Sequence, residues 1–296
     1  MADENDQKDG TTNEMSRRDF VALSLAGIAA ATASVQGAEH RVTETEVSIE
    51  TPDGTCDAAF IYPSTGAHAA VLIWADAFGL RPSMRDMAKR LAADGYSVLV
   101  PNPYYRVAKA PVLAGDISKF NFSNPTDRNK LTPLMGSINA DGAAERDAVA
   151  FIAWLDQQKQ VDTSKKIGTQ GYCMGGPLVM RTAAAVPNRI GAVGSFHGGG
   201  LVTDAPNSPH LLAPKMKARL YIGIAANDDQ RQPDGKDKLR AAFKSAGRTA
   251  EIEVYKSLHG WCVPDMPADP ASPIYNKPEA EKAWSKLVAL YHTALA

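Results

Sequence analysis

The sequence predicts an α/β fold, in which a mostly parallel central sheet carries helices on both faces. Apolar strand-like runs alternate with helix-like runs over most of the 296 residues, and this alternation is typical of parallel sheets with crossover helices. The run 69–74 is apolar throughout, as expected for a strand that is buried on both faces. The length suits one large core, and no internal repeat indicates a second folded domain.

The expected elements alternate along the chain and are separated by turn residues. Pro52-Asp53-Gly54 supplies the turn of an opening hairpin. Val149, Ile152 and Leu155 recur on one side of a helix. In order, we expect strands 42–49 and 57–62, strand 69–74, a helix around 84–91, strand 97–100, an irregular excursion over 110–141 and a helix over 144–155. Then we expect strand 167–170, a turn and a helix through 182–185, strands 192–196 and 220–224, a further helix, strand 251–255, and a final helix over 279–295.

One hexapeptide carries most of the functional information. Gly171-Tyr172-Cys173-Met174-Gly175-Gly176 lies between a predicted strand and a predicted helix, and a nucleophile flanked by small residues there is the sequence form of a nucleophile elbow. The strained turn requires glycines, and the following helix points its positive end at the nucleophile. Cys173 could instead be an inert core thiol, but the flanking glycines would then have no evident purpose.

Two further residue types complete the pattern in the expected chain order of nucleophile, acid and base. Asp228 and Asp229 follow strand 220–224, and His259 follows strand 251–255. All three lie past the carboxyl ends of strands, where open α/β sheets carry their sites. Only one of two adjacent aspartates can reach the imidazole, and the residues alone leave that choice open. His259 is favoured over the other five histidines, which are His40, His68, His197, His210 and His292.

These motifs together resemble the dienelactone hydrolase family, which has the α/β-hydrolase fold. The likeness runs from Val42 to the C-terminus and implies Cys173 as nucleophile, His259 as base and Asp228 as the acid that orients the base. It also implies an oxyanion hole made by the backbone N–H groups of Met174 and Ala77. The matching segments are 171–176, 227–228, 259–261, Trp74-Ala75-Asp76-Ala77-Phe78-Gly79 and Pro101-Asn102-Pro103-Tyr104-Tyr105-Arg106.

The sequence departs from the family pattern at two positions. Asp76 stands where the family usually has a glutamate that contacts the nucleophile, so Asp76 is either a shorter active-site auxiliary or a residue that fixes its own loop. Val263 stands where well-known members have an arginine that binds a substrate carboxylate. Aromatic residues near the excursion are candidate pocket walls or plain packing residues, namely Tyr104, Tyr105, Phe120 and Phe122.

A cysteine nucleophile restricts the substrate. A thiolate leaves a tetrahedral intermediate more readily than an alkoxide does, so we expect activated esters or enol-lactones. Alternatives are a thioesterase or general carboxylesterase on the same fold, or a catalytically silent binding protein. The sequence has no Cys/His cluster at metal spacing and no dinucleotide fingerprint, so no metal or cofactor is expected. A net charge of −1 gives no reason to expect nucleic acid as a partner.

The first 38 residues read as a targeting segment ahead of a hydrolase domain over 39–296. Ser16-Arg17-Arg18-Asp19-Phe20-Val21 precedes a mild apolar run over 22–35, which resembles a bacterial twin-arginine (Tat) signal. The run is too short and weak for a stable membrane span. Cleavage near Ala33 or Ala38, the Tat machinery as partner and a periplasmic location are therefore expected, against a tail with a chance Arg-Arg pair. Whether Cys56 or Cys262 forms a disulfide there stays open.

Overall fold

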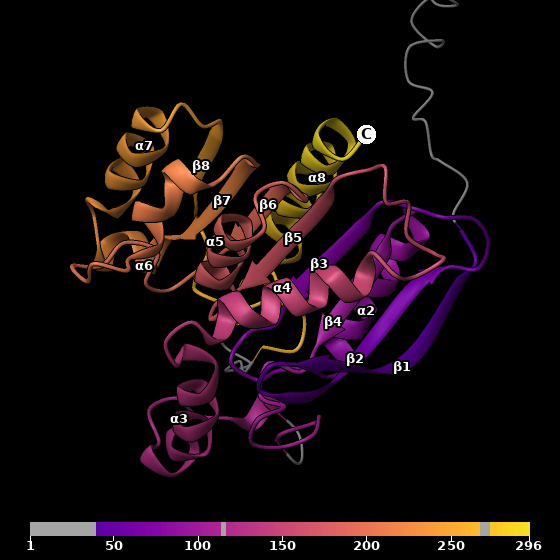
Figure 1. Ribbon diagram of the computed structural model, residues 1–296. Helices are drawn as coiled ribbons and strands as arrows, with labels where there is room; N and C mark the ends of the chain where they lie inside the picture. The colour runs from indigo at the N-terminus through magenta and orange to yellow at the C-terminus, as the bar shows by residue number, and fades with distance from the viewer. Residues whose placement is uncertain (1–39, 114–116, 267–272) are drawn as a thin grey trace, which may run out of the picture. The chain divides into compact units, whose positions relative to one another are not determined.

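An eight-stranded sheet organises the computed structural model, which describes residues 40–113, 117–266 and 273–296. The strand order is β1-β2-β4-β3-β5-β6-β7-β8. Strand β2 runs antiparallel to both of its neighbours, whereas all other neighbouring strands are parallel. The predicted α/β fold with a mostly parallel sheet is thereby confirmed (Figure 1).

The described elements match the predicted order closely. The strands are β1 (Val42–Thr51), β2 (Gly54–Pro63), β3 (Ala70–Trp74), β4 (Ser97–Pro101), β5 (Ile167–Tyr172), β6 (Ile190–Phe196), β7 (Arg219–Ala225) and β8 (Ala250–Tyr255). The α-helices are α2 (Pro82–Ala93), α3 (Pro125–Asn139), α4 (Ala143–Leu155), α5 (Gly175–Ala185), α6 (Ala226–Arg231), α7 (Gly235–Ser245) and α8 (Lys277–Ala294), and two 3₁₀ helices are η1 (Ile117–Lys119) and η2 (Pro209–Lys215).

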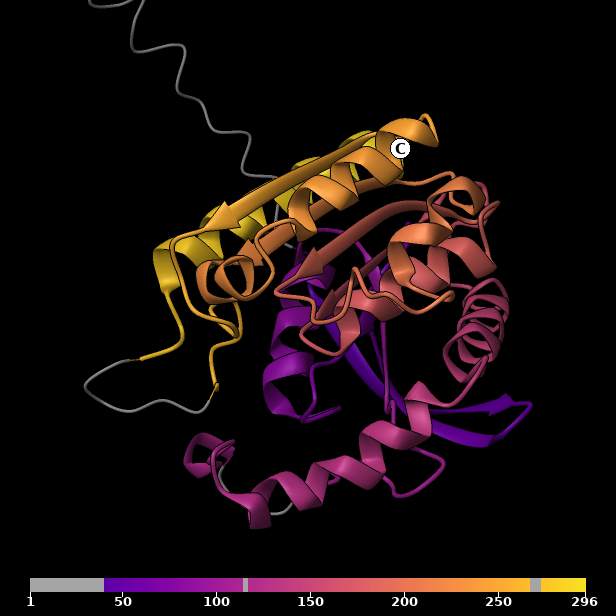
Figure 2. The same ribbon diagram turned by 90° about the vertical axis from the view of Figure 1, so that its left-hand side faces the viewer.

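Helices cover both faces of the sheet (Figures 1 and 2). On one face, α2 packs on β2 and β4 and α8 packs on β6 and β7, and the two helices meet where the Arg90 guanidinium lies over the Trp284 ring. On the other face, α5 packs on the central strands and contacts α4 and η2. Helix α3 lies outside these two layers and packs against α4.

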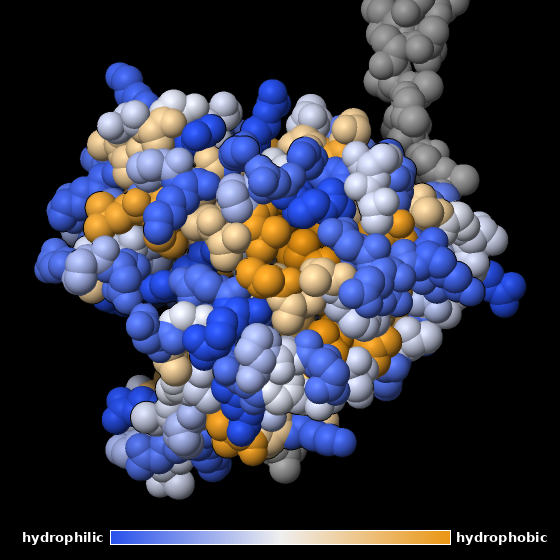
Figure 3. All heavy atoms as spheres, in the orientation of Figure 1, coloured by the Kyte–Doolittle hydropathy of each residue, from blue (hydrophilic) through white to orange (hydrophobic). Residues whose placement is uncertain are grey.

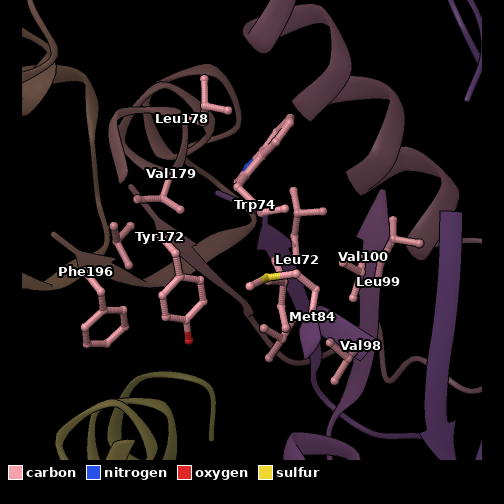
Figure 4. Close-up of a cluster of buried hydrophobic side chains, with 14 of the residues drawn as sticks. Leu72, Trp74, Met84, Val98, Leu99, Val100, Tyr172, Leu178, Val179 and Phe196 are labelled. Atoms are coloured by element: carbon pink, nitrogen blue, oxygen red, sulfur yellow. The ribbon is translucent and has the colours of Figure 1, made fainter. Parts of the chain in front are cut away.

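The core is centred on β3, β4 and β5, in which every residue is buried. Trp74 at the end of β3 packs toward α5 and donates its indole N–H to the Thr182 hydroxyl at 2.9 Å. On the opposite side of the sheet, the rings of Tyr172 and Phe196 stack with centroids 5.4 Å apart (Figure 4). These two rings anchor the last residues of β5 and β6, so the residues that follow leave the sheet from fixed points.

The turn between β5 and α5 requires glycine because backbone segments approach too closely for a side chain. A Cβ atom on Gly175 would lie 2.3 Å from the carbonyl oxygen of Trp74, and one on Gly171 would lie 2.2 Å from the carbonyl oxygen of Gly175. Real Cβ atoms do not make such contacts. The glycines of the hexapeptide therefore bring the first turn of α5 directly against the end of β3.

The irregular excursion expected over 110–141 contains a longer helix than the sequence indicated. Helix α3 has 15 residues and begins where the Asn124 side chain accepts the N–H of Thr126, with Pro125 in the first turn. Pro133 lies inside it, and the concentration of proline and glycine in this segment concealed the helix.

The predicted buried side of α4 is wrong at one position. Val149 is 52% exposed, whereas Ile152 and Leu155 are buried as expected. The helix turns Asp147 inward instead, where its carboxylate binds Arg106. Figure 3 shows a mostly hydrophilic face with hydrophobic residues gathered over the region of α4, and Val149 is among the exposed large hydrophobic residues.

The predicted signal segment, residues 1–38, lies outside the described residues. Among the helices that are described, none has both the length and the apolar character needed to cross a membrane.

Candidate active site

Cys173 lies at the sharp turn between β5 and α5. Its backbone has a φ of +52°, and a non-glycine residue in this left-handed region costs about 1–2 kcal/mol. The Cys173 N–H lies 3.1 Å from the carbonyl oxygen of Phe196 and 3.1 Å from Nδ1 of His197, which both accept it. The side chain is half-buried. Such strain is typical of functional turns that neighbouring structure holds in place.

Asp228 and His259 meet beyond the ends of β7 and β8. The two strands are parallel, with Ala225 opposite Tyr255, so the segments that follow them emerge side by side. Oδ2 of Asp228 lies 2.7 Å from Nδ1 of His259, and the His259 N–H donates to Oδ1 of Asn227. Asp228 lies in the short helix α6 rather than in the loop that the sequence indicated.

The choice between the two adjacent aspartates is decided by the side-chain directions. Asp229 turns away from the imidazole and binds the ammonium group of Lys236 at 2.7 Å. Asp228 is the aspartate that hydrogen-bonds the imidazole. It also lies 3.3 Å from Arg231, whose side chain is 72% exposed. A single carboxylate therefore fixes the orientation and the tautomer of the His259 ring.

The Cys173 thiol is close enough to the His259 ring to act on its protonation. Burial by itself lowers the pKa of His259, but the hydrogen bonds to Asp228 and Cys173, together with their negative charges, outweigh burial and raise the pKa from 6.5 to about 10. The ring therefore favours the imidazolium form, which is the form that stabilises a neighbouring thiolate. The three residues form a connected row from Asp228 through His259 to Cys173.

The two expected oxyanion-hole residues lie on neighbouring segments. Strands β3 and β5 pair with Trp74 opposite Gly171, and Ala77 and Met174 each lie three residues beyond this pair. The Tyr104 hydroxyl donates to the carbonyl oxygen of Ala77 at 2.8 Å and lies 3.2 Å from the sulfur of Met174. Tyr104 is thus a buried link between the two segments.

The other candidate pocket walls divide into two groups. Phe120 and Phe122 pack against Phe78, with ring centroids 5.1 and 5.6 Å from it. Phe78 directly follows Ala77, so this aromatic cluster adjoins the expected oxyanion hole. Tyr105 turns elsewhere and donates its hydroxyl to Asp147 at 2.7 Å.

The Asp76 carboxylate is fully buried and forms an ion pair with an arginine instead of contacting Cys173. Both of its oxygens accept hydrogen bonds from Arg81 at 2.8 Å, and Oδ1 also accepts the N–H of Phe78 at 2.9 Å. Arg81 in turn binds both oxygens of Asp265, at 2.8 and 2.9 Å. Arg81 therefore ties the loop after β3 to the loop that carries His259, and Asp76 fixes its own loop.

The structure offers no free cation at the position where the family arginine would stand. Val263 occupies that position and is fully buried. Arg81 is the buried cation of the neighbouring loop, and two carboxylates share it. A negatively charged substrate would therefore have to compete with Asp76 and Asp265 for Arg81.

His197 is a site residue that sequence reasoning missed. The chain order favours His259 and gives His197 no role, because His197 precedes the acid, yet the ring centroid of His197 lies 4.8 Å from that of His259. The signal that could have found it is its position directly after β6, at the same end of the sheet as Cys173 and His259. Parallel neighbouring strands bring such residues together.

The remaining cysteines differ from Cys173 in their surroundings. All three thiols are free, but Cys56 and Cys262 are buried, and burial raises the pKa of both. Cys262 lines a cavity of about 450 Å³ between α2 and α8, which neither Cys173 nor His259 lines. Within the described ranges, no group of three or more histidine, cysteine or acidic side chains could hold a metal ion.

Replacing Arg81 should be costly because it would leave Asp76 buried without its partner. We expect Arg81→Gln to lower the free energy of unfolding by about 3–5 kcal/mol. Arg85→Gln is the matched control, because Arg85 binds Glu44 and Glu46 at the partly exposed surface and its loss should cost less than about 1 kcal/mol. Urea unfolding of both variants measures the difference, and equal small losses would contradict a buried clamp.

The raised pKa of His259 predicts a distinctive titration. Because the folded-state pKa of about 10 exceeds the usual 6.5, protonated His259 stabilises the fold fully below about pH 6.5, and this contribution declines as the pH rises toward 10. NMR of isotope-labelled histidine rings should show this high midpoint. In Asp228→Asn the midpoint should fall toward 6.5, and a midpoint near 6.5 in both proteins would refute the coupling.

Comparisons with known proteins show which family the chain resembles. Residues 57–295 match the dienelactone hydrolase family. A relative from Methylorubrum extorquens, provisionally named carboxymethylenebutenolidase, is 28% identical over 274 residues, covering 87% of this chain and 89% of that protein. The carboxymethylenebutenolidase of Rhodococcus opacus is 25% identical over 264 residues, covering 86% of this chain and 94% of that protein.

Solved structures agree on the fold. A crystal structure from Klebsiella pneumoniae, provisionally titled a dienelactone hydrolase, is 22% identical with a TM-score of 0.69, and the match covers 86% of this chain and 99% of that chain. The expected α/β-hydrolase fold and the expected class, a carboxylic ester hydrolase, are both confirmed. With its family match extending over most of its length, the chain belongs to the dienelactone hydrolase family.

Proposed function

We propose that the chain hydrolyses activated esters or enol-lactones through Cys173 as the nucleophile, with His259 as the base and Asp228 as its acid partner. The observation that carries this proposal is the row of the three side chains, in which Asp228 lies 2.7 Å from His259 and the Cys173 thiol is close enough to help raise the pKa of His259. The left-handed turn at Cys173 supports it further, since it presents the thiol beside the first turn of α5.

The proposed reaction proceeds through a thioester. In the reactive form the thiol proton is already on His259, as a thiolate–imidazolium pair, and the Cys173 sulfur attacks the carbonyl carbon, forming a C–S bond while the C=O electron pair moves to oxygen. The N–H groups of Met174 and Ala77 receive this oxyanion. The intermediate expels the alcohol, which takes its proton from His259. Water, deprotonated by His259, then cleaves the thioester to the carboxylic acid, and the returned proton restores the thiol.

The leaving group decides which esters can react. The tetrahedral intermediate expels whichever group is the weaker base, and a cysteine thiolate is a far weaker base than an alkoxide. Simple alkyl esters would therefore return to starting materials, whereas enol, phenol or thiol leaving groups allow the forward step. Thioesters are accordingly acceptable substrates, and a general alkyl carboxylesterase is disfavoured.

The charges around the site favour a neutral substrate. Val263 provides no cation, and Arg81 is already bound by Asp76 and Asp265. The packed rings of Phe78, Phe120 and Phe122 adjoin the Ala77 segment and offer an apolar surface. We therefore propose a neutral acyl group with apolar character rather than a dienelactone-type carboxylate.

The leaving-group argument predicts a large difference between two acetates. Saturating p-nitrophenyl acetate should turn over much faster than saturating ethyl acetate, because p-nitrophenolate leaves readily. Cys173→Ala should lower the p-nitrophenyl acetate rate by at least about 10³-fold with the fold unchanged by circular dichroism. Cys262→Ala is the matched control and should retain activity. Equal turnover of the two esters, or activity that survives in Cys173→Ala, would overturn the proposal.

We also propose export of the folded protein by the twin-arginine machinery to a bacterial periplasm, supported by Arg17 and Arg18 ahead of the apolar run 22–35. In a bacterial host, the full chain should appear in the periplasmic fraction, shortened near Ala33 or Ala38. Arg17→Lys with Arg18→Lys should keep it inside the cell. A periplasmic product from the double variant would argue against this route.

A further inference from the structure

His197 holds a strained position directly after β6. Its φ is +40°, which is unfavourable for a residue with a side chain. The His197 N–H donates to the carbonyl oxygen of Gly223 at 2.8 Å, so β7 fixes the backbone. A glycine would adopt this positive φ without strain, yet the position holds a histidine. A fully buried imidazole at a strained position suggests that the ring itself has a function.

The hydrogen bond from Cys173 fixes the tautomer of His197. Nδ1 accepts the Cys173 N–H at 3.1 Å, so Nδ1 carries no proton and the proton of the neutral ring is on Nε2. Burial, and the nearby His259 to a lesser degree, lower the pKa of His197 well below 6.5. A charged ring would direct an N–H from Nδ1 against the N–H of Cys173. His197 therefore stays neutral and cannot take a proton at Nδ1.

The same ring also contacts the proposed base. The centroids of His197 and His259 are 4.8 Å apart with an interplanar angle of 64°, and those of His197 and Trp261 are 5.2 Å apart at 68°. The edge-to-face contact with His197 restricts the plane of the His259 ring, and the contact with Trp261 holds His197 itself. His197 is thus in contact with both the backbone of the nucleophile and the ring of the base.

We propose that His197 is a positioning residue for the Cys173–His259 pair. Its neutral ring holds the Cys173 N–H at the left-handed turn and packs against His259, so the thiol has one proton acceptor, His259, at a fixed orientation. His197 is not assigned any contact with substrate. The proposal rests on the proposed function for its kinetic readout, whereas its tautomer and its effect on thiol reactivity can be measured without any ester.

Two substitutions distinguish the effect of the hydrogen-bond acceptor of His197 from the effect of the shape of its ring. His197→Phe keeps an aromatic ring but removes the acceptor. His197→Asn retains a polar group near the place of Nδ1, and asparagine tolerates positive φ. Alkylation by iodoacetamide reports on Cys173, because Cys56 and Cys262 are buried, and Cys173→Ala provides the blank.

For His197→Phe we expect alkylation at pH 6–7 to fall about tenfold, as for the loss of one hydrogen bond to the nucleophile, and the alkylation profile to move to higher pH. The kcat for p-nitrophenyl acetate should fall similarly with little change in KM. His197→Asn should recover most of both losses. His292→Phe, at an exposed position on α8, is the control and should match the unsubstituted protein.

A folded His197→Phe variant with an unchanged alkylation profile and unchanged kcat would overturn the proposal. If this variant does not fold, NMR of ¹⁵N-labelled rings in the unsubstituted protein decides. An unprotonated Nδ1 and a protonated Nε2 that persist from about pH 5 to 9 would support the proposal, and a proton on Nδ1 or a titration in that range would refute it. Ester turnover that survives in Cys173→Ala would instead refute the proposed function and leave these ring measurements valid.

Discussion

The site depends on the close approach of two backbone segments, the start of α5 and the end of β3. A Cβ on Gly175 would lie 2.3 Å from the Trp74 carbonyl oxygen, so any side chain there would push the segments apart. The contact sets the height of Cys173 above the sheet and, through the pairing of β3 with β5, brings Ala77 beside Met174. The thiol and the expected oxyanion donors therefore share one rigid support.

Buried polar contacts then join loops that are far apart in the sequence. Arg81 connects the loop after β3 with Asp265 beyond β8, and His197 connects β6 with Cys173 and His259. Arg81 and His197 are themselves buried, so water and salt weaken their contacts less than they would weaken contacts at the surface. Half-buried Cys173 and His259 are thus surrounded by residues with little freedom, although both lie in turns rather than in regular elements.

Much of the fold was predictable from hydrophobic runs and turn residues, because a buried parallel strand reads as a continuous apolar segment. Helix α3 was not, since its prolines suggest a loop and only the Asn124 cap with Pro125 indicates where it begins. Val149 was placed on the wrong side because periodicity gives the stripe of a helix but not the packing partner, and Asp147 is buried there by Arg106.

The sequence by itself determined the order of the strands along the chain, the elbow with its obligatory glycines, and the short set of residues from which a site could be built. Only the tertiary structure decided that Asp228 rather than Asp229 contacts His259, that Asp76 is held by Arg81, and that His197 lies against the Cys173–His259 pair. The physical reason is that propensity and spacing act along the chain, whereas side-chain direction and ion pairing depend on neighbours that parallel strands bring together from distant positions.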